Sequence, residues 1–374
     1  MRLYKKISIM TSIICLGLCL IPAVLSALMY YEAGTHVWSR QTGNTIIGVP
    51  VVVMDNDIQT ARIYFGSMDS FFYCCNAFDG TLEWTFQCDS APYGSPIVIK
   101  SNVIFGCESG KILCLKNGYM QWSYLMSGIV YGGISYDGMS IYIASVGGDI
   151  VSLNPNNGKE NWVYQTFDQL YTRPVVNNGL LYIGSGSDNK VYCIDTVHGT
   201  LVWQQHMQGA ILTTIGLDAD NYYIGDVKGT FQCYRRDTSF MLWEKKLRSG
   251  VVGSPVVYDE YIICGTEEGI YCIDKTFGNT LWYVHTDSPC TAPCTIGDYV
   301  LVGCENSKMY VIRRSNGEAF TYSIDTGEHG DGAIRTSPIY SDGFTYFGTH
   351  DGRMYCLSVG SGGAADNPDG GQHY

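Results

Sequence analysis

Seven tryptophans recur along this chain at nearly constant spacing, and this repeat limits the fold more than any other feature. Their separations are 46, 38, 40, 41, 40 and 39 residues, and Phe320 follows 38 residues after the last. A period near forty residues is typical of repeat proteins, in which each unit packs on its neighbours. The 374 residues are therefore expected to form one large repeating domain. The repeat positions are Trp38, Trp84, Trp122, Trp162, Trp203, Trp243 and Trp282.

Each repeat contains signals for four short strands. A glycine such as Gly80 or Gly199 stands four residues before most tryptophans, which predicts a hairpin turn followed by a strand with an inward-packed aromatic end. A second hairpin signal, such as Ser109-Gly110, recurs upstream. Four antiparallel strands make one blade of a β-propeller. The weakest copies are the fifth, where Ser239 replaces the turn glycine, and the seventh, where Phe320 replaces tryptophan.

Counting the units predicts a closed ring. Eight strand openings occur, at Pro50, Ser95, Gly133, Arg173, Thr214, Ser254, Ala292 and Ser337. The eighth unit lacks its tryptophan strand, whereas the strand at 35–40 has no partner strands before it. We therefore predict an all-β, eight-bladed β-propeller of four-stranded antiparallel blades over residues 31–358, with the last blade closed by the N-terminal strand. Such closure removes the unpaired edges of an open array.

The best-preserved copies resemble a known repeat family. VYCIDTVHGTLVW at 191–203 and IYCIDKTFGNTLW at 270–282 are similar to the quinoprotein-type (PQQ-like) repeat, with Cys193 and Cys272 where alanine is usual. The resemblance covers residues 34–358 and implies a propeller. In the family's dehydrogenases, a quinone cofactor lies in the central channel with a calcium ion, a catalytic aspartate and a stacking tryptophan. In this chain every tryptophan occupies the repeat position and the junctions are short, so we expect no catalytic residue, no cofactor and no metal.

In plan, the chain most resembles the non-enzymatic propeller lipoprotein of bacterial outer-membrane assembly. This resemblance implies that one face of the propeller binds partner proteins. We therefore expect a non-catalytic exported scaffold or binding module with an unidentified protein partner. Two alternatives stay open. One is a PQQ-dependent quinoprotein dehydrogenase that uses PQQ and calcium. The other is a sensor that binds a small molecule or carbohydrate through tyrosines such as Tyr131, Tyr171 and Tyr222.

Two departures from the repeat mark candidate binding residues. Arg173 occupies a strand-opening position where small residues are usual, and only the last junction carries an insertion. Because junctions gather at one mouth of a propeller, these residues could together hold an anionic ligand or a partner. The plain alternative is a solvated loop with surface ion pairs. The candidate residues are Arg173, Glu328, His329, Asp331 and Arg335.

The N-terminal segment predicts export. Arg2, Lys5 and Lys6 precede an uncharged, apolar run from Ile7 to Tyr31, so residues 1–30 are expected to be a signal peptide or a signal anchor. The protein would then be extracytoplasmic, either secreted or anchored, with membrane contact only through this segment. Residues 359–374 are small and polar, which predicts a disordered tail.

The net charge and the cysteine content limit the kinds of partner and of cysteine chemistry that we expect. A formal net charge of −12 disfavours nucleic acid as a partner. Fifteen cysteines occur, mostly within strand-like text, where a buried free thiol behaves as a small apolar side chain. Cys290 and Cys294 lie close enough in sequence for a disulfide or a metal site, but buried free thiols are the favoured interpretation.

Overall fold

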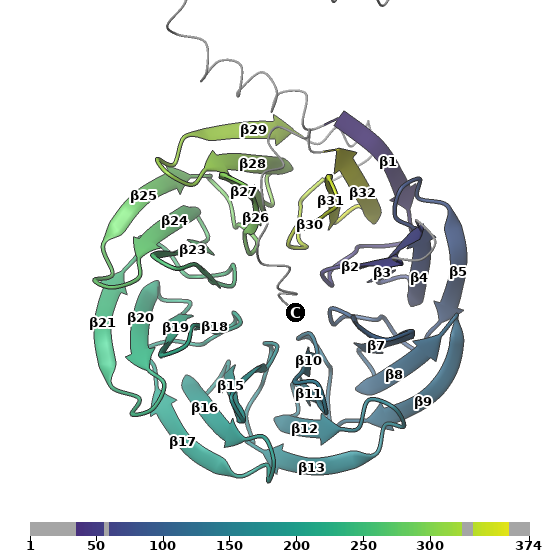
Figure 1. Cartoon of the computed structure of the whole chain (residues 1–374), viewed down its shortest axis with the longest axis horizontal. Coiled ribbons are helices and arrows are strands. Elements are labelled where there is room, and N and C mark those ends of the chain that lie inside the picture. Colours follow the sequence, from purple (N-terminus) through teal and green to yellow (C-terminus); the bar gives the residue numbers. More distant parts are fainter. Residues whose placement is uncertain (1–34, 56–59, 324–331, 359–374) are drawn as a thin grey trace, which may run out of the picture.

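The computed structural model describes residues 35–55, 60–323 and 332–358, which form a ring of eight antiparallel sheets with four strands each (Figure 1). The innermost strand of each sheet lies nearest the axis of the ring, and the strand that carries the tryptophan, or Phe320 in one sheet, lies outermost. The predicted fold class and blade number are confirmed. Within this described part of the chain, no helix has the length and hydropathy needed to cross a membrane.

The blades follow one another along the chain, and each sheet is ordered from its innermost to its outermost strand. Blade 1 is β2 (Val51–Asp55), β3 (Thr60–Gly66), β4 (Phe71–Asn76) and β5 (Leu82–Gln87); blade 2 is β6 (Ile97–Ile99), β7 (Asn102–Gly106), β8 (Lys111–Lys116) and β9 (Tyr119–Leu125). Blade 3 is β10 (Ser135–Tyr136), β11 (Ile141–Ala144), β12 (Asp149–Leu153) and β13 (Glu160–Gln165); blade 4 is β14 (Val175–Asn177), β15 (Leu180–Gly184), β16 (Lys190–Asp195) and β17 (Leu201–His206). Blade 5 is β18 (Gly216–Leu217), β19 (Asn221–Gly225), β20 (Thr230–Arg235) and β21 (Met241–Lys246); blade 6 is β22 (Val256–Val257), β23 (Tyr261–Gly265), β24 (Gly269–Asp274) and β25 (Thr280–His285). Blade 7 is β26 (Cys294–Ile296), β27 (Tyr299–Gly303), β28 (Lys308–Arg313) and β29 (Ala319–Ser323); blade 8 is β30 (Ile339–Ser341), β31 (Phe344–Gly348), β32 (Arg353–Ser358) and β1 (Thr35–Gln41).

Blade 8 is built from both ends of the chain. Strand β1 pairs antiparallel with β32, from Thr35 opposite Ser358 to Gln41 opposite Arg353. The N-terminal strand therefore closes the ring, as the sequence predicts. The expected targeting segment at 1–30 and the expected tail at 359–374 lie outside the described residues.

Tryptophans hold consecutive blades together. The indole of Trp122 in blade 2 packs on Gly158 in the last turn of blade 3, where a Cβ atom would lie only 2.5 Å from the ring. The Trp122 Nε1–H donates to the Pro155 carbonyl of the same turn at 3.1 Å. Glycine is required at this position for two reasons: the indole leaves no space for a Cβ atom, and the backbone φ is +67°, which other residues rarely adopt. The same packing on a glycine with positive φ recurs for Trp38, Trp84, Trp162, Trp243 and Trp282.

Cysteines fill the space behind these tryptophans. In six blades the residue directly opposite the tryptophan on the neighbouring strand is a cysteine, as for Cys193 opposite Trp203. Small side chains at this position leave room for the indole between the sheets. The prediction that strand cysteines are buried free thiols is confirmed for these six, which are Cys74, Cys114, Cys193, Cys233, Cys272 and Cys356.

The two weak copies depart from this scheme in different ways. Ser239 keeps the left-handed turn with φ +55°, and Trp203 stacks on Tyr222 with ring centroids 5.5 Å apart. In blade 7, Phe320 lies opposite Val311, and β29 lacks the register shift that accompanies every tryptophan strand. One residue fewer in this strand therefore accompanies the loss of the indole.

A glycine-to-alanine pair can separate backbone strain from loss of docking. Gly138 also has a positive φ, +97°, but has no atom within 4 Å of a Cβ. We expect G138A to cost about 1 kcal/mol of unfolding free energy from strain alone. G158A should cost at least ~2 kcal/mol more, because it also displaces Trp122. Urea unfolding followed by circular dichroism measures both; equal losses would contradict the docking role.

The buried thiols make stability depend on alkaline pH. Burial raises the pKa of Cys114, Cys193, Cys233, Cys272 and Cys356 to about 12 each, whereas an unfolded thiol titrates near ~8.5. The unfolded state therefore loses protons first as pH rises, and stability should fall from about pH 8.5 upward, by up to ~1.4 kcal/mol per pH unit for each thiol. Urea midpoints between pH 7 and 10 test this; a midpoint that stays constant over that range would refute it.

Candidate functional site

The ring has two unlike faces. One face, which we call the junction face, carries the junctions between blades and the turns between second and third strands. The opposite turn face carries the remaining two turns of each blade. On the junction face each turn donates a backbone hydrogen bond to the junction before it, as from Glu108 N to Ala91 O and from Val227 N to Ala210 O. The junctions are thus fixed in register and present equivalent side chains around the axis.

The strand-opening residues form part of a ring around the axis. The Val49 N–H donates to Ser95 Oγ of the next blade at 3.0 Å, and the Thr214 N–H donates likewise to Ser254 Oγ. Between these pairs, the Arg173 side chain crosses toward Gly133, where a Cβ atom would lie 3.1 Å from Arg173 Cδ. A glycine at position 133 therefore accommodates the neighbouring arginine.

Arg173 is a partly buried cation that has no counter-charge among the residues that the structure describes. Among the described residues it forms no hydrogen bond or ion pair, and burial lowers the pKa of its guanidinium. An arginine nevertheless stays protonated at neutral pH. A desolvated positive charge of this kind favours a ligand or partner group that brings a carboxylate or another anion.

Arg335, the other candidate binding residue within the described part of the chain, does not lie near Arg173. Arg335 lies on the opposite side of the ring, in the junction before blade 8, and its Nε is 3.4 Å from Glu305 Oε1 (Figure 1). The structure therefore does not bring Arg173 and Arg335 together as a pair. Glu328, His329 and Asp331 lie outside the described residues.

An arc of apolar side chains lies beside this ring. Each lies two residues before the strand-opening residue of its junction, which is Val49, Ser95, Gly133, Arg173, Thr214 or Ser254. Tyr93 and Tyr131 contact edge to face with ring centroids 4.6 Å apart, and Tyr131 is 5.6 Å from Tyr171. Tyr131, Leu212 and Val252 expose 37%, 46% and 36% of their surface. Blades 7 and 8 interrupt the arc with Thr291 and Arg335. We call Ile47, Tyr93, Tyr131, Tyr171, Leu212 and Val252 the apolar crescent.

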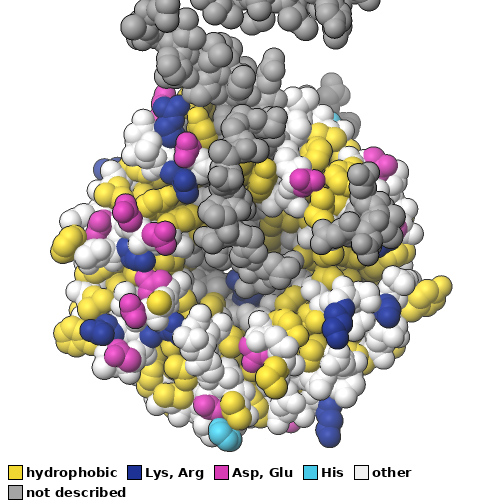
Figure 2. Space-filling model, in the orientation of Figure 1, with side chains coloured by type: hydrophobic (Ala, Val, Ile, Leu, Met, Phe, Trp, Pro, Cys, Tyr) yellow, Lys and Arg dark blue, Asp and Glu magenta, His cyan; other side chains and the backbone are white. Residues whose placement is uncertain are grey.

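The tyrosines proposed for a sensor do not lie together. Tyr131 and Tyr171 belong to the apolar crescent, but Tyr222 is fully buried, with its hydroxyl against Ser239 Oγ at 2.9 Å. Tyr222 therefore serves packing between blades 4 and 5. On the face shown in Figure 2, Lys and Arg side chains are scattered among Asp and Glu rather than gathered in one basic surface. Charges mixed in this way do not concentrate a positive potential that would attract a phosphate backbone to that face.

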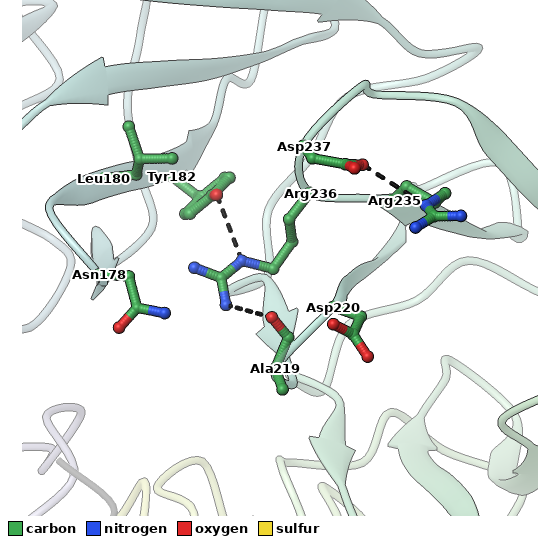
Figure 3. Close-up of a pocket in the computed structure, with 8 residues that line it drawn as sticks. All are labelled: Asn178, Leu180, Tyr182, Ala219, Asp220, Arg235, Arg236 and Asp237. Atoms are coloured by element: carbon green, nitrogen blue, oxygen red, sulfur yellow. Dashed lines mark hydrogen bonds and ion pairs between the residues drawn. The ribbon is translucent and has the colours of Figure 1, made fainter.

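A cleft of about 240 Å³ lies between blades 4 and 5 on the turn face (Figure 3). Arg236 crosses it: its Nε–H donates to Tyr182 Oη at 3.3 Å, and its Nη1 donates to the Ala219 carbonyl at 3.1 Å. Further bonds to the Asp218 and Asn177 carbonyls join the two blades. The residues that line the cleft are Asn178, Leu180, Tyr182, Ala219, Asp220, Arg235, Arg236 and Asp237.

The cleft is better explained by blade packing than by ligand binding. The Arg236 guanidinium is engaged by four protein acceptors, and Arg235 pairs with Asp237 at 3.4 Å. The two arginines of the cleft therefore already have protein partners. Sequence reasoning missed the Arg236 clamp, although Ser239, the break in the glycine pattern three residues later, marks the same blade.

The described residues do not fit a quinone cofactor with calcium. All seven tryptophans lie in outermost strands, away from the axis, and five of them donate their indole N–H to a neighbouring blade. The adjacent Cys74 and Cys75 point into two different cores. Within the described ranges no three His, Cys, Asp or Glu side chains are grouped so that they could hold a metal ion.

The fold and the repeat define a propeller of the PQQ-like repeat class. The sequence matches the family described as outer membrane protein assembly factor BamB over residues 27–187, 108–216 and 187–371. Because these matches cover most of its length, the chain belongs to that family.

The chain is similar to individual proteins both inside and outside this family. The outer membrane protein assembly factor BamB of Yersinia pestis is 22% identical over 276 residues, covering 68% of this chain and 70% of that protein. A tetrathionate hydrolase of Acidithiobacillus ferrooxidans is 22% identical over 77% of this chain and 60% of its own length. The crystal structure of BamB from Moraxella catarrhalis superposes with a TM-score of 0.70 at 18% identity, over 87% of this chain and 99% of that one. At such identity the structural likeness shows the fold alone.

Proposed function

We propose that this chain is an extracytoplasmic, non-catalytic propeller that binds a protein partner in the assembly of outer-membrane proteins. The observation that carries the proposal is the apolar crescent, which places three exposed and three half-buried apolar side chains at one repeat position of six consecutive blades. Contiguous exposed apolar surface next to polar residues is typical of protein interaction sites. The family assignment supports the same role.

The partner is proposed to dock over the junction face. Tyrosines of the crescent offer large, rigid contact area, as at many interfaces. Arg173, beside the crescent, would receive a carboxylate of the partner. Arg335 on the opposite side already faces Glu305, so it should contribute less. Export through residues 1–30, by a signal peptide or a signal anchor, remains part of the proposal.

Photo-crosslinking tests the docking surface in cells. We expect p-benzoyl-phenylalanine at Tyr131 or Leu212 to capture a protein of the outer-membrane assembly machinery, identified by mass spectrometry. The control position is Met139, on the turn face of blade 3, which is 82% exposed. Equal capture of the same protein from Met139, or no protein adduct from the crescent, would refute the proposed surface.

Arg173 should separate binding from stability. Because the charge of Arg173 is partly buried and has no partner within residues 35–55, 60–323 and 332–358, R173Q should leave the unfolding free energy unchanged or raise it. The same change should weaken partner binding by about thirty-fold, equivalent to ~2 kcal/mol for an unpaired interfacial carboxylate. R62Q removes the same charge from an ion pair with Glu83 near the turn face of blade 1 and serves as the control. Titration calorimetry with the captured partner measures the affinity of each variant. Equal affinities for R173Q and R62Q would exclude this role.

A further inference from the structure

The junction between blades 1 and 2 carries a pair of thiols at two corresponding positions. Cys88 is the first residue after the outermost strand β5, and Cys107 is the first residue after β7 in the next blade. Blade 1 shows how these positions lie. There the corresponding residues are Thr42 and Ser67, and Ser67 Oγ donates to Thr42 Oγ1 at 3.1 Å. The repeat therefore places the two side chains in direct contact.

The backbone around the two thiols has the same arrangement. Glu108 N donates to Ala91 O at 2.8 Å, just as Met68 N donates to Thr45 O at 2.8 Å in blade 1. Ser109 N adds a bond to Ser90 Oγ at 2.8 Å. Residues next to Cys88 thus lie along residues next to Cys107, as in the blade with the observed side-chain contact.

Both residues are free thiols in the structure, shielded from solvent and placed in one core. Cys88 exposes 7% of its surface and Cys107 none, and both belong to the cluster between blades 1 and 2. Hydrogen bonding to Cys88 and burial raise the pKa of the Cys107 thiol. A neutral buried thiol reacts slowly, so any oxidation of this pair would take place while the blades are still assembling.

The chain already uses one of these positions for a disulfide. Cys304 in blade 7 corresponds to Cys107, and it is bonded to Cys290 of the preceding junction. This bond corrects the expectation that Cys290 is a free thiol or a partner of Cys294, which remains free. Thr286, which corresponds to Cys88, has its Oγ1 3.2 Å from Cys290 Sγ. The disulfide and the Cys88 position therefore converge on the same point of the repeat.

We propose that Cys88 and Cys107 form a second disulfide, which ties the junction before blade 2 to the second turn of that blade. The two thiols lose two protons and two electrons and form one S–S bond. The electrons reduce an external disulfide, such as oxidised glutathione or an oxidised dithiol protein, to two thiols. The bond would hold the segment that carries Tyr93 of the apolar crescent, although the proposal does not depend on the proposed function.

Peptide mapping under non-reducing conditions tests the bond. The full chain is refolded in detergent with a glutathione redox buffer, alkylated and digested. We expect one linked pair of peptides from Cys88 and Cys107 and another from Cys290 and Cys304. If Cys88 and Cys107 are both alkylated, whether or not Cys290 and Cys304 are linked, the proposal is wrong.

Two variants separate loss of the bond from loss of packing. C88T with C107S rebuilds the Thr42–Ser67 pair of blade 1 and should fold normally, yet melt about 5 °C below the unmodified oxidised protein. With dithiothreitol this difference should largely disappear. C114S removes a neighbouring buried thiol and should leave both links in place. Equal melting of C88T/C107S and the unmodified chain under oxidising conditions would overturn the proposal.

Discussion

The structure depends on the docking of one indole on one glycine at six of the eight contacts between consecutive blades. The contact needs a glycine for two reasons, since the turn requires a positive φ and the ring leaves no space for a Cβ atom. It also needs a small residue behind the indole, which cysteine supplies in most blades. These three requirements recur every forty residues and explain why the sequence repeats. They also explain why the tryptophans and the cysteines opposite them serve the packing of the blades.

Because the outer contacts hold the ring, residues at the junctions are free to differ. The strand-opening position accepts serine, glycine, threonine or arginine. Serine there accepts an N–H from the preceding junction, whereas Gly133 leaves room for the neighbouring Arg173 side chain. The position of the apolar crescent accepts tyrosine, leucine, valine or isoleucine. A face of this kind can be adapted to a partner without loss of the fold.

The periodicity was sufficient to predict the number of blades, their strand content and the closure by the N-terminal strand. Contacts that depend on how blades sit beside one another were not predictable in this way. The clamp of Arg236 on Tyr182 and Ala219 joins residues from two blades. The Cys290–Cys304 bond likewise joins a junction to a turn. Arg173 stood out as an exception in the repeat, but its separation from Arg335 follows only from the placement of blades 4 and 8 around the ring.

The shared eighth blade sets the order of events when the protein is made. Strand β1 is synthesised first, but its partner β32 emerges from the ribosome only after some three hundred further residues. Until then the early blades form an open array with an unpaired strand at its start, and contacts this distant in sequence form slowly. A nascent chain of this design would benefit from a holding chaperone, and truncation of even its final strand would leave the first strand without a partner.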